Sequence, residues 1–212
     1  MKIKQFVFND FQENTYIVYD EKTKACFIID PGCYTNTEQQ TLKSFITANG
    51  LKPKKLLNTH CHIDHVFGNN FVAKTFGIDL AIHKNDLATL QAVPDYAPVY
   101  GFSVESSVEP KEFLEDKQII GLGDASFEVL YVPGHSAGHV AFVNHQQKFV
   151  ISGDVLFYGS IGRTDLPGGD YNTLINSIKS KLFPLGDDYT VYSGHGPATS
   201  IGFERANNPF LV

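Results

Sequence analysis

The chain has 212 residues, of which 42% are hydrophobic and 19% charged, and its formal net charge is −6. This composition is ordinary for a globular protein and excludes a disordered chain, while no apolar stretch approaches the ~20 residues of a membrane-spanning helix. The acidic balance, without any block of like charges, disfavours a nucleic-acid-binding surface.

Location and domain organisation follow from the same features. Residues 1–10 are too short and too interrupted for the apolar region of a signal peptide, so we expect a cytoplasmic protein. The three cysteines, Cys26, Cys33 and Cys61, are odd in number and fit no zinc-finger spacing, so we expect free thiols. With no linker-like stretch or repeat, residues 1–212 are predicted to form a single domain.

The first half of the chain begins with strands and continues with helices. Strands are expected at residues 3–8, 15–19 and 26–29, where β-branched and aromatic residues are broken by turns. Leu42, Phe45 and Ile46 at helical spacing predict a helix over 38–49 that ends at Gly50. Further helices are expected at 70–76 and 84–92, followed by a long ordered loop over 93–108.

The second half returns to strands, expected at residues 127–132, 139–144 and 148–152. A turn-rich stretch at 160–170 then leads into a helix over about 172–182 and a last strand at 189–192. Strands followed by helices in each half predict two sheets flanked by helices.

Four apolar runs, at residues 56–60, 129–135, 149–154 and 191–195, each end in a turn-forming residue and then a potential metal ligand. The first run continues as His60-Cys61-His62-Ile63-Asp64-His65, and the others end at His135, Asp154 and His195. If the strands are neighbours, their ends bring these side chains to one rim of a sheet. Taken singly, each outlying residue is equally typical of a turn, but together with the cluster the set predicts a metal site.

The donor types restrict the chemistry of that site. Imidazole and carboxylate suit zinc, iron or manganese, and seven ligands exceed the three or four that one catalytic ion uses. The economical interpretation is two ions that share Asp154, the only strand-end carboxylate outside the cluster. Two such ions lower the pKa of a water held between them towards ~7, which favours hydrolysis. Alternation along the chain directs Cys61 away from the ligands, and His83 and His145 are interpreted as solvated or capping residues. His139 is interpreted as an ordinary residue of the fold rather than as a support for the ligands, which is the less favoured alternative.

On these residues the chain resembles the metallo-β-lactamase superfamily, from the Asp30-Pro31-Gly32 turn to His195. The resemblance implies an αββα sandwich, an α/β fold of two mixed sheets flanked by helices. It also implies His60, His62 and His135 on one metal ion and Asp64, His65 and His195 on the other, with Asp154 as the bridge.

The Gly162-Arg163-Thr164-Asp165 segment resembles that of glyoxalase II and of persulfide dioxygenases, whereas true β-lactamases of this fold usually differ at the bridging position. The resemblance implies that Arg163 fixes the loop or meets an anionic substrate and that Asp165 orients a ligand histidine. The alternative is that Arg163 and Asp165 form a surface ion pair that contributes little to stability. Long glyoxalase II enzymes hold glutathione with an added C-terminal domain, and here seventeen residues follow His195, so we expect a glyoxalase-II-like hydrolase without tight glutathione binding.

The leading functional hypothesis is a dinuclear metal hydrolase of thioesters such as S-lactoylglutathione, with zinc favoured over iron or manganese. Asp64 would help to hold the attacking hydroxide, the partner would be a small-molecule thioester, and a homo-oligomer is allowed. The alternative enzyme is a mononuclear iron persulfide dioxygenase that uses His60, His135 and Asp154. A non-catalytic metal-binding scaffold is disfavoured because structural sites close their coordination.

Overall fold

The computed structural model describes residues 1–212 and divides into two compact units. Unit 1 comprises Met1–Phe113 and Leu122–Asp124, and unit 2 comprises Leu114–Gly121 and Ala125–Val212. Each unit contains its own sheet and its own hydrophobic core, and the single domain expected over 1–212 stays a prediction. No helix has the length and apolar character required to span a membrane.

The sheet of unit 1 is mixed and has the strand order β1-β2-β3-β4-β5-β6. Its strands are β1 (Lys2–Phe8), β2 (Glu13–Tyr19), β3 (Ala25–Ile29), β4 (Lys52–Leu57), β5 (Leu80–His83) and β6 (Glu112–Leu114). The first three strands run antiparallel, whereas β3, β4 and β5 run parallel. Strand β3 is fully buried and has a continuous apolar sequence, whereas the buried strand β2 begins with the polar residues Glu13, Asn14 and Thr15.

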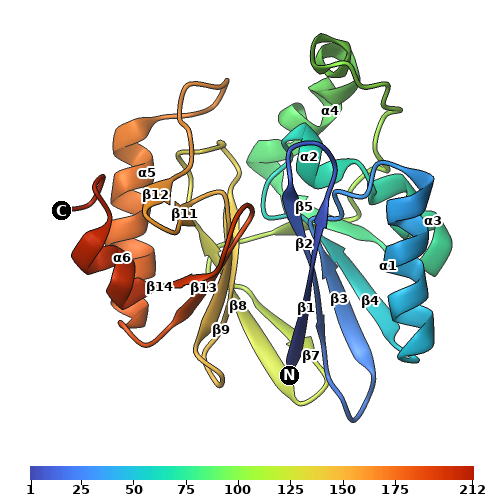
Figure 1. Ribbon diagram of the computed structural model, residues 1–212, viewed down its shortest axis with the longest axis horizontal. Helices are drawn as coiled ribbons and strands as arrows, with labels where there is room; N and C mark the ends of the chain where they lie inside the picture. Colours follow the sequence, from blue (N-terminus) through green and yellow to red (C-terminus); the bar gives the residue numbers. More distant parts are fainter. The chain divides into compact units, whose positions relative to one another are not determined.

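The helices of unit 1 follow the parallel strands, and α1 and α3 cover one face of the sheet (Figure 1). They are α1 (Asn36–Ala48), α2 (Ile63–Val66), α3 (Asn69–Phe76), η1 (Lys84–Asp86), α4 (Leu87–Tyr96) and η2 (Ala97–Tyr100). Helix α1 begins with a capping box in which Thr35 and Glu38 satisfy each other's backbone N–H groups. Leu42 and Ile46 of this helix are buried in the core of unit 1 together with Val72 of α3.

The sheet of unit 2 is also mixed, with the strand order β14-β13-β10-β9-β8-β7. Its strands are β7 (Ile119–Leu122), β8 (Ala125–Tyr131), β9 (Val140–Asn144), β10 (Phe149–Gly153), β13 (Thr190–Ser193) and β14 (Thr199–Ser200). Strands β10 and β13 run parallel, whereas β8 with β9, β9 with β10, and β13 with β14 pair antiparallel. A separate two-stranded ribbon joins β11 (Leu156–Phe157) to β12 (Ser160–Ile161).

The helical part of unit 2 covers one face of its sheet (Figure 1). It consists of α5 (Tyr171–Ser177), the π-helical η3 (Ile178–Leu182), η4 (Phe183–Leu185) and α6 (Ile201–Asn207). Leu174, Ile178 and Leu182 point into the core of this unit with Val150 and Val191 of the strands.

The elements predicted from the sequence are confirmed with shifts of one to three residues, and residues 101–108 of the expected loop lie outside helices and strands. The exception is 93–100. The sequence predicts a loop there, but α4 continues through Pro94 to Tyr96 and is followed by η2. Val93 and Ala97 are buried in the core of unit 1, and their burial stabilises the extra helical turns despite the N–H that Pro94 lacks.

Candidate functional site

The candidate ligands of unit 1, called here the first ligand group, are His60, His62, Asp64 and His65. Strands β3 and β4 are parallel neighbours, with Ile29 paired to Leu57, so the residues that follow them lie at the same edge of the sheet. Asp30 follows β3 and the ligand group follows β4, with the last two ligands on the short helix α2. The imidazole centroids of His60 lie 4.8 Å from His62 and 4.1 Å from His65.

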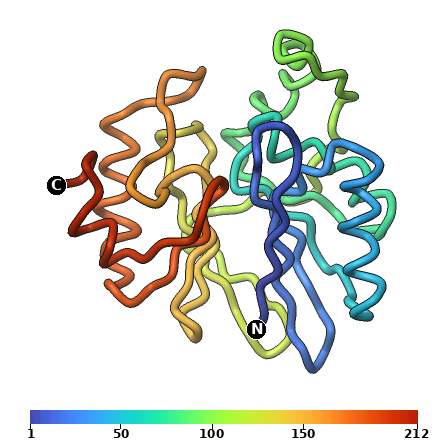
Figure 2. Tube along the Cα trace, viewed as in Figure 1, coloured from blue at the N-terminus to red at the C-terminus, as the bar shows by residue number.

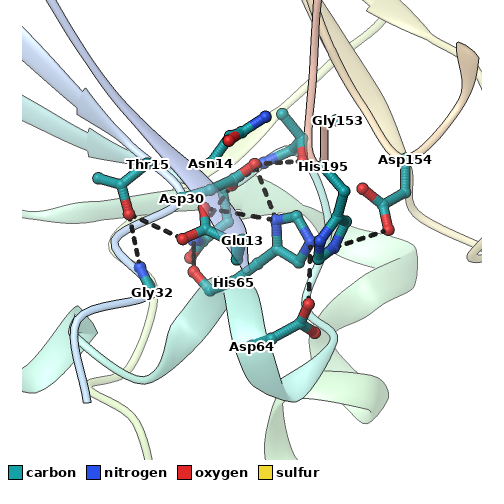
Figure 3. A network of polar contacts seen from close by, with 12 residues as sticks. Glu13, Asn14, Thr15, Asp30, Gly32, Asp64, His65, Gly153, Asp154 and His195 are labelled. Atoms are coloured by element: carbon teal, nitrogen blue, oxygen red, sulfur yellow. Dashed lines mark hydrogen bonds and ion pairs between the residues drawn. The ribbon is translucent and has the colours of Figure 1, made fainter. Parts of the chain in front are cut away.

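Asp30 organises this group through its carboxylate (Figure 3). It accepts hydrogen bonds from the backbone N–H (2.7 Å) and the hydroxyl (2.6 Å) of Thr59. Because that hydroxyl has donated its proton, its 3.1 Å contact with Nδ1 of His60 makes the imidazole the donor. Asp30 also lies 3.2 Å from Nδ1 of His65. Both imidazoles are thereby held with Nε2 available as the ligand atom.

A second buried carboxyl group, Glu13, supports the same edge. The hydroxyl of Thr15 donates to Glu13 (2.8 Å) and accepts from the backbone N–H of Gly32 (2.9 Å), as Figure 3 shows. Glu13 lies 4.0 Å from Nδ1 of His65, and burial raises the pKa of its carboxyl group well above the ordinary value. The turn after β3 is therefore tied both to β2 and to a ligand histidine.

The candidate ligands of unit 2, the second ligand group, are His135, Asp154 and His195. Asp154 follows β10 and His195 follows β13, and these parallel strands are neighbours, so the two side chains leave the same edge of the sheet. The N–H of Gly194 donates to the carbonyl of Gly153 (2.8 Å), which aligns the two turns. His135 comes from the segment after β8.

Two contacts orient this second group. Nδ1 of His135 donates to the carbonyl oxygen of Arg163 (2.8 Å), which leaves Nε2 as the ligand atom. The backbone N–H of Asp154 donates to Nε2 of the buried His139 (3.1 Å). His139 therefore fixes the backbone of the carboxylate ligand, although the sequence favoured an ordinary structural residue at this position.

The spacing of the ligand atoms matches what a metal ion requires. Nε2 of His135 lies 3.6 Å and Nε2 of His195 lies 3.5 Å from the same oxygen, Oδ2 of Asp154. In unit 1, Nε2 of His65 lies 3.5 Å from Oδ2 of Asp64. Four ligand atoms placed tetrahedrally at about 2.0–2.1 Å from one ion lie about 3.4 Å from each other. The donor types and these spacings fit divalent metal ions.

Arg163 and Asp165 pair with each other on an exposed turn, through two hydrogen bonds of 2.7 Å. These bonds lower the pKa of Asp165 to about 2. The contact to a ligand histidine comes from the backbone carbonyl of Arg163 rather than from the carboxylate of Asp165.

Cys61 lies between two ligand histidines but is fully buried in the hydrophobic core of unit 1. Burial raises the pKa of its thiol, and the neighbouring carboxylate of Asp86 raises it further, so the thiol stays protonated. The direction expected from alternation along the chain is confirmed, since the thiol faces the core.

The sequence did not predict that four residues support the candidate ligands. All four are deeply buried and contact segments that carry ligands: Glu13, Asp30, Asp86 and His139. Asp30 carried a usable signal, because it stands directly after an apolar strand, as the outlying ligands do. Glu13 and Asp86 carried none, since a single acidic residue beside a turn is usually solvated.

Comparison with known proteins places the chain among metal-dependent enzymes. A family model described as the metallo-β-lactamase superfamily matches residues 8–195. The hydroxyacylglutathione hydrolase GloC of Haemophilus influenzae is 38% identical over 213 residues, which cover 100% of this chain and 98% of that protein.

Two solved structures are similar over the full length. BLEG-1, described as a B3 metallo-β-lactamase, is 35% identical with a TM-score of 0.91 and full coverage of both chains. TTHA1623, described in a di-iron-bound form, is 36% identical with a TM-score of 0.88, covering 98% of this chain and 100% of the other. The predicted fold class, two mixed sheets flanked by helices in the metallo-β-lactamase fold, is confirmed.

Proposed function

The chain belongs to the metallo-β-lactamase superfamily, a family of metallo-hydrolases, and on that premise we propose that it is a dinuclear-metal hydrolase of thioesters. The proposed substrate class is S-acylglutathione thioesters, of which S-lactoylglutathione is the first to test. The name of the Haemophilus influenzae relative, a hydroxyacylglutathione hydrolase, supports this choice.

One observation carries the proposal. Oδ2 of Asp154 lies 3.6 Å from Nε2 of His135 and 3.5 Å from Nε2 of His195. The two histidines come from different segments of unit 2. These spacings identify Asp154 as a ligand, and because seven candidate ligands exceed the three or four that one catalytic ion uses, they support Asp154 as the ligand shared between two ions.

The proposed ligand sets follow the family resemblance, with Asp154 shared between two ions. One ion is assigned to His60, His62 and His135, and the other to Asp64, His65 and His195. Zinc is the proposed resident metal because the donors are mainly imidazole. Iron and manganese are the alternatives, and the di-iron form of TTHA1623 supports including iron in the test.

Two bound ions would supply a hydroxide at neutral pH and would polarise the thioester carbonyl. Asp64, buried except for a small part of its side chain, is proposed to accept a hydrogen bond from the attacking water and to orient it. This hydroxide would add to the thioester carbonyl carbon and the carbon–sulfur bond would break, releasing a carboxylate and a thiol. His139 keeps Asp154 in position throughout by accepting from its N–H.

Arg163 is assigned a structural part in this mechanism. Its carbonyl fixes the tautomer of His135, and its guanidinium holds the turn through Asp165. An anionic substrate would compete with Asp165 for the same guanidinium, so substrate contact by Arg163 requires that this pair opens.

The test is hydrolysis of S-lactoylglutathione by protein loaded separately with zinc, iron or manganese, followed by the loss of thioester absorbance. We expect turnover with at least one metal, two metal ions per chain, and loss of both activity and the second ion in Asp154→Asn. Asp188→Asn is the control, because this exposed carboxylate pairs with Lys148 on the surface of unit 2.

A fully active Asp154→Asn variant that holds one metal would overturn the dinuclear proposal. Oxygen uptake with glutathione persulfide, in the absence of thioester hydrolysis, would favour the mononuclear dioxygenase instead. A chromogenic β-lactam is included as a third substrate, since BLEG-1 is described as a β-lactamase.

A further inference from the structure

Unit 1 carries an exposed apolar surface made of Phe11, Val99 and Tyr100, called here the aromatic patch. Their exposed fractions are 36%, 83% and 47%. The ring of Phe11 lies 6.0 Å from that of Tyr100, although the two residues come from different parts of the chain. Phe11 belongs to the loop between β1 and β2, and the other two to η2, which directly follows α4 (Figure 1).

The aromatic patch has a rigid base. Below it, Phe102 contacts Phe11 (5.5 Å), Tyr34 (5.1 Å) and Phe67 (4.9 Å) through their rings. The hydroxyl of Tyr34 also contacts the backbone of Ser103 at 3.3–3.4 Å. Exposed rings that are already fixed lose little conformational entropy when a ligand covers them, which favours binding.

Hydrogen bonds connect this surface to the first ligand group. The side-chain amide of Asn9 donates to the backbone carbonyl of Asp64 (3.0 Å), and its Oδ1 accepts from the N–H of Phe11 (2.9 Å). One side chain therefore joins the proposed water-orienting residue to an exposed ring two residues along the chain. Figure 2 shows the hairpin loop at the same end of unit 1 as the segment that carries η2.

A second connection runs through Tyr96 at the end of α4. Its ring lies 6.2 Å from that of Tyr100. Helix α4, which ends at Tyr96, packs against α2, the helix that carries Asp64 and His65. Both segments of the aromatic patch are therefore connected to the helix that carries Asp64.

The charges around the aromatic patch decide what can bind to it. Residues 9–12 and 95–105 contain no Lys, Arg or His, but they contain Asp10, Asp95 and Glu105. A glutathionyl group carries two carboxylates, and these two segments contain acidic residues and no cation to pair with them. An uncharged apolar group can pack against the rings and is not repelled by the acidic residues.

We propose that the aromatic patch binds the acyl chain of the thioester, and that the enzyme prefers apolar or aromatic acyl groups to small polar ones. This inference rests on the proposed thioester hydrolysis and adds the substrate class. Phe11 and Tyr100 are specificity-determining residues, and Val99 forms the outer border of the surface.

The test compares thioesters of one thiol with acetyl, lactoyl, hexanoyl and phenylacetyl groups. In the wild type we expect kcat/KM to rise by about tenfold or more from acetyl to hexanoyl and phenylacetyl, because added apolar groups in a hydrophobic site give 10–200-fold discrimination. Phe11→Ala and Tyr100→Ala should raise KM for the hexanoyl and phenylacetyl thioesters more than for the acetyl thioester, and so abolish most of this preference. Val99→Asp should do the same without affecting folding, since Val99 is 83% exposed.

Tyr171→Ala is the matched control, because Tyr171 is a tyrosine of unit 2 with the same exposed fraction of 47%. Equal rates across the acyl series in the wild type, or equal loss for every acyl group in the variants, would overturn the proposal. The proposal would also be overturned if the protein were a dimer that Val99→Asp dissociates without changing the acyl preference. The aromatic patch would then bind a second copy of the chain.

A second series keeps the acyl group and changes the thiol, and a preference that depends on the thiol alone would also overturn the assignment. If no thioester is hydrolysed, the proposed function fails by itself. Equilibrium dialysis of the metal-loaded protein with the S-phenethyl thioether of the same thiol then tests the aromatic patch. Binding that Val99→Asp weakens by about tenfold supports it, and equal binding to both proteins rejects it.

Discussion

The carboxylate of Asp86 accepts a 2.7 Å hydrogen bond from the backbone N–H of Cys61, the residue between His60 and His62. Asp86 is fully buried at the end of η1, so this bond ties the turn that presents two candidate ligands to the start of α4. The bond explains how a chain segment without regular structure can hold two imidazoles in a fixed orientation.

Replacing Asp86 by Ala should destabilise the protein and weaken metal binding together. The buried N–H of Cys61 would lose its acceptor, which costs about 1–3 kcal/mol. Urea denaturation measures the stability, and metal content after dialysis measures the site. Asp95→Ala, an exposed carboxylate on α4, is the control and should change neither quantity. Unchanged metal content in Asp86→Ala would show that the turn holds its shape without this bond.

A second prediction concerns the contact of 3.2 Å between Asp30 and Nδ1 of His65. In Asp30→Asn, an amide N–H can face the imidazole and favour the tautomer that protonates Nε2, so that the ligand atom is blocked. We expect metal affinity to fall by about 10–100-fold, as for other carboxylates that support a histidine ligand. Competition with a coloured chelator measures the affinity.

Asp20→Asn is the matched control for Asp30→Asn. Asp20 is a buried turn carboxylate of the same unit that accepts hydrogen bonds from the backbone N–H groups of Lys22 and Thr23. Its replacement should reduce stability while leaving metal affinity unchanged. Equal affinities in Asp30→Asn and wild type would contradict the orienting role of Asp30.

The ligand pattern was accessible from the sequence because strand, turn and ligand are consecutive in the chain. Asp154 and His195 could be assigned to one edge from their positions in the sequence, since each follows an apolar run that proved to be one of two parallel neighbours. The buried supports could not be found in this way. Asp86 is 25 residues from its partner Cys61, and only the folded chain brings them together.

The error over residues 93–100, the first half of the loop predicted over 93–108, has a different cause. Pro94 and the nearby Gly, Tyr and Ser residues are typical of loops, and local preference predicted one. Burial of Val93 and Ala97 outweighed that preference and continued the helix. This continuation places Tyr96 and Tyr100 in contact, and so forms part of the aromatic patch.

A third prediction concerns Gly162, which lies against the backbone of a candidate ligand. A Cβ added there would lie 1.9 Å from the carbonyl oxygen of Asp154 and 3.0 Å from Nδ1 of His135. Gly162→Ala should therefore displace the second ligand group and reduce metal content and activity. Gly121→Ala is the control, because its Cβ would have no atom within 4 Å. A Gly162→Ala protein with full metal content would show that the turn after β12 shifts at no cost to the site.

The last prediction is the pH dependence of the Arg163–Asp165 pair. Hydrogen bonds from the guanidinium hold the pKa of Asp165 at about 2 in the folded protein, below the value of about 3.9 for an unfolded chain. A carboxyl group with a lowered folded-state pKa stabilises the protein above pH ~4, and this contribution is lost as the pH falls from about 4 to about 2. Both side chains are more than half exposed, so solvent and salt screen the pair and its effect on stability is small.

NMR titration of the Asp165 carboxyl carbon should give a midpoint near 2 in wild type, shifted towards 4 in Arg163→Gln. A wild-type midpoint near 4 would mean that the guanidinium is not engaged by Asp165, and Arg163 would then be available to an anionic substrate.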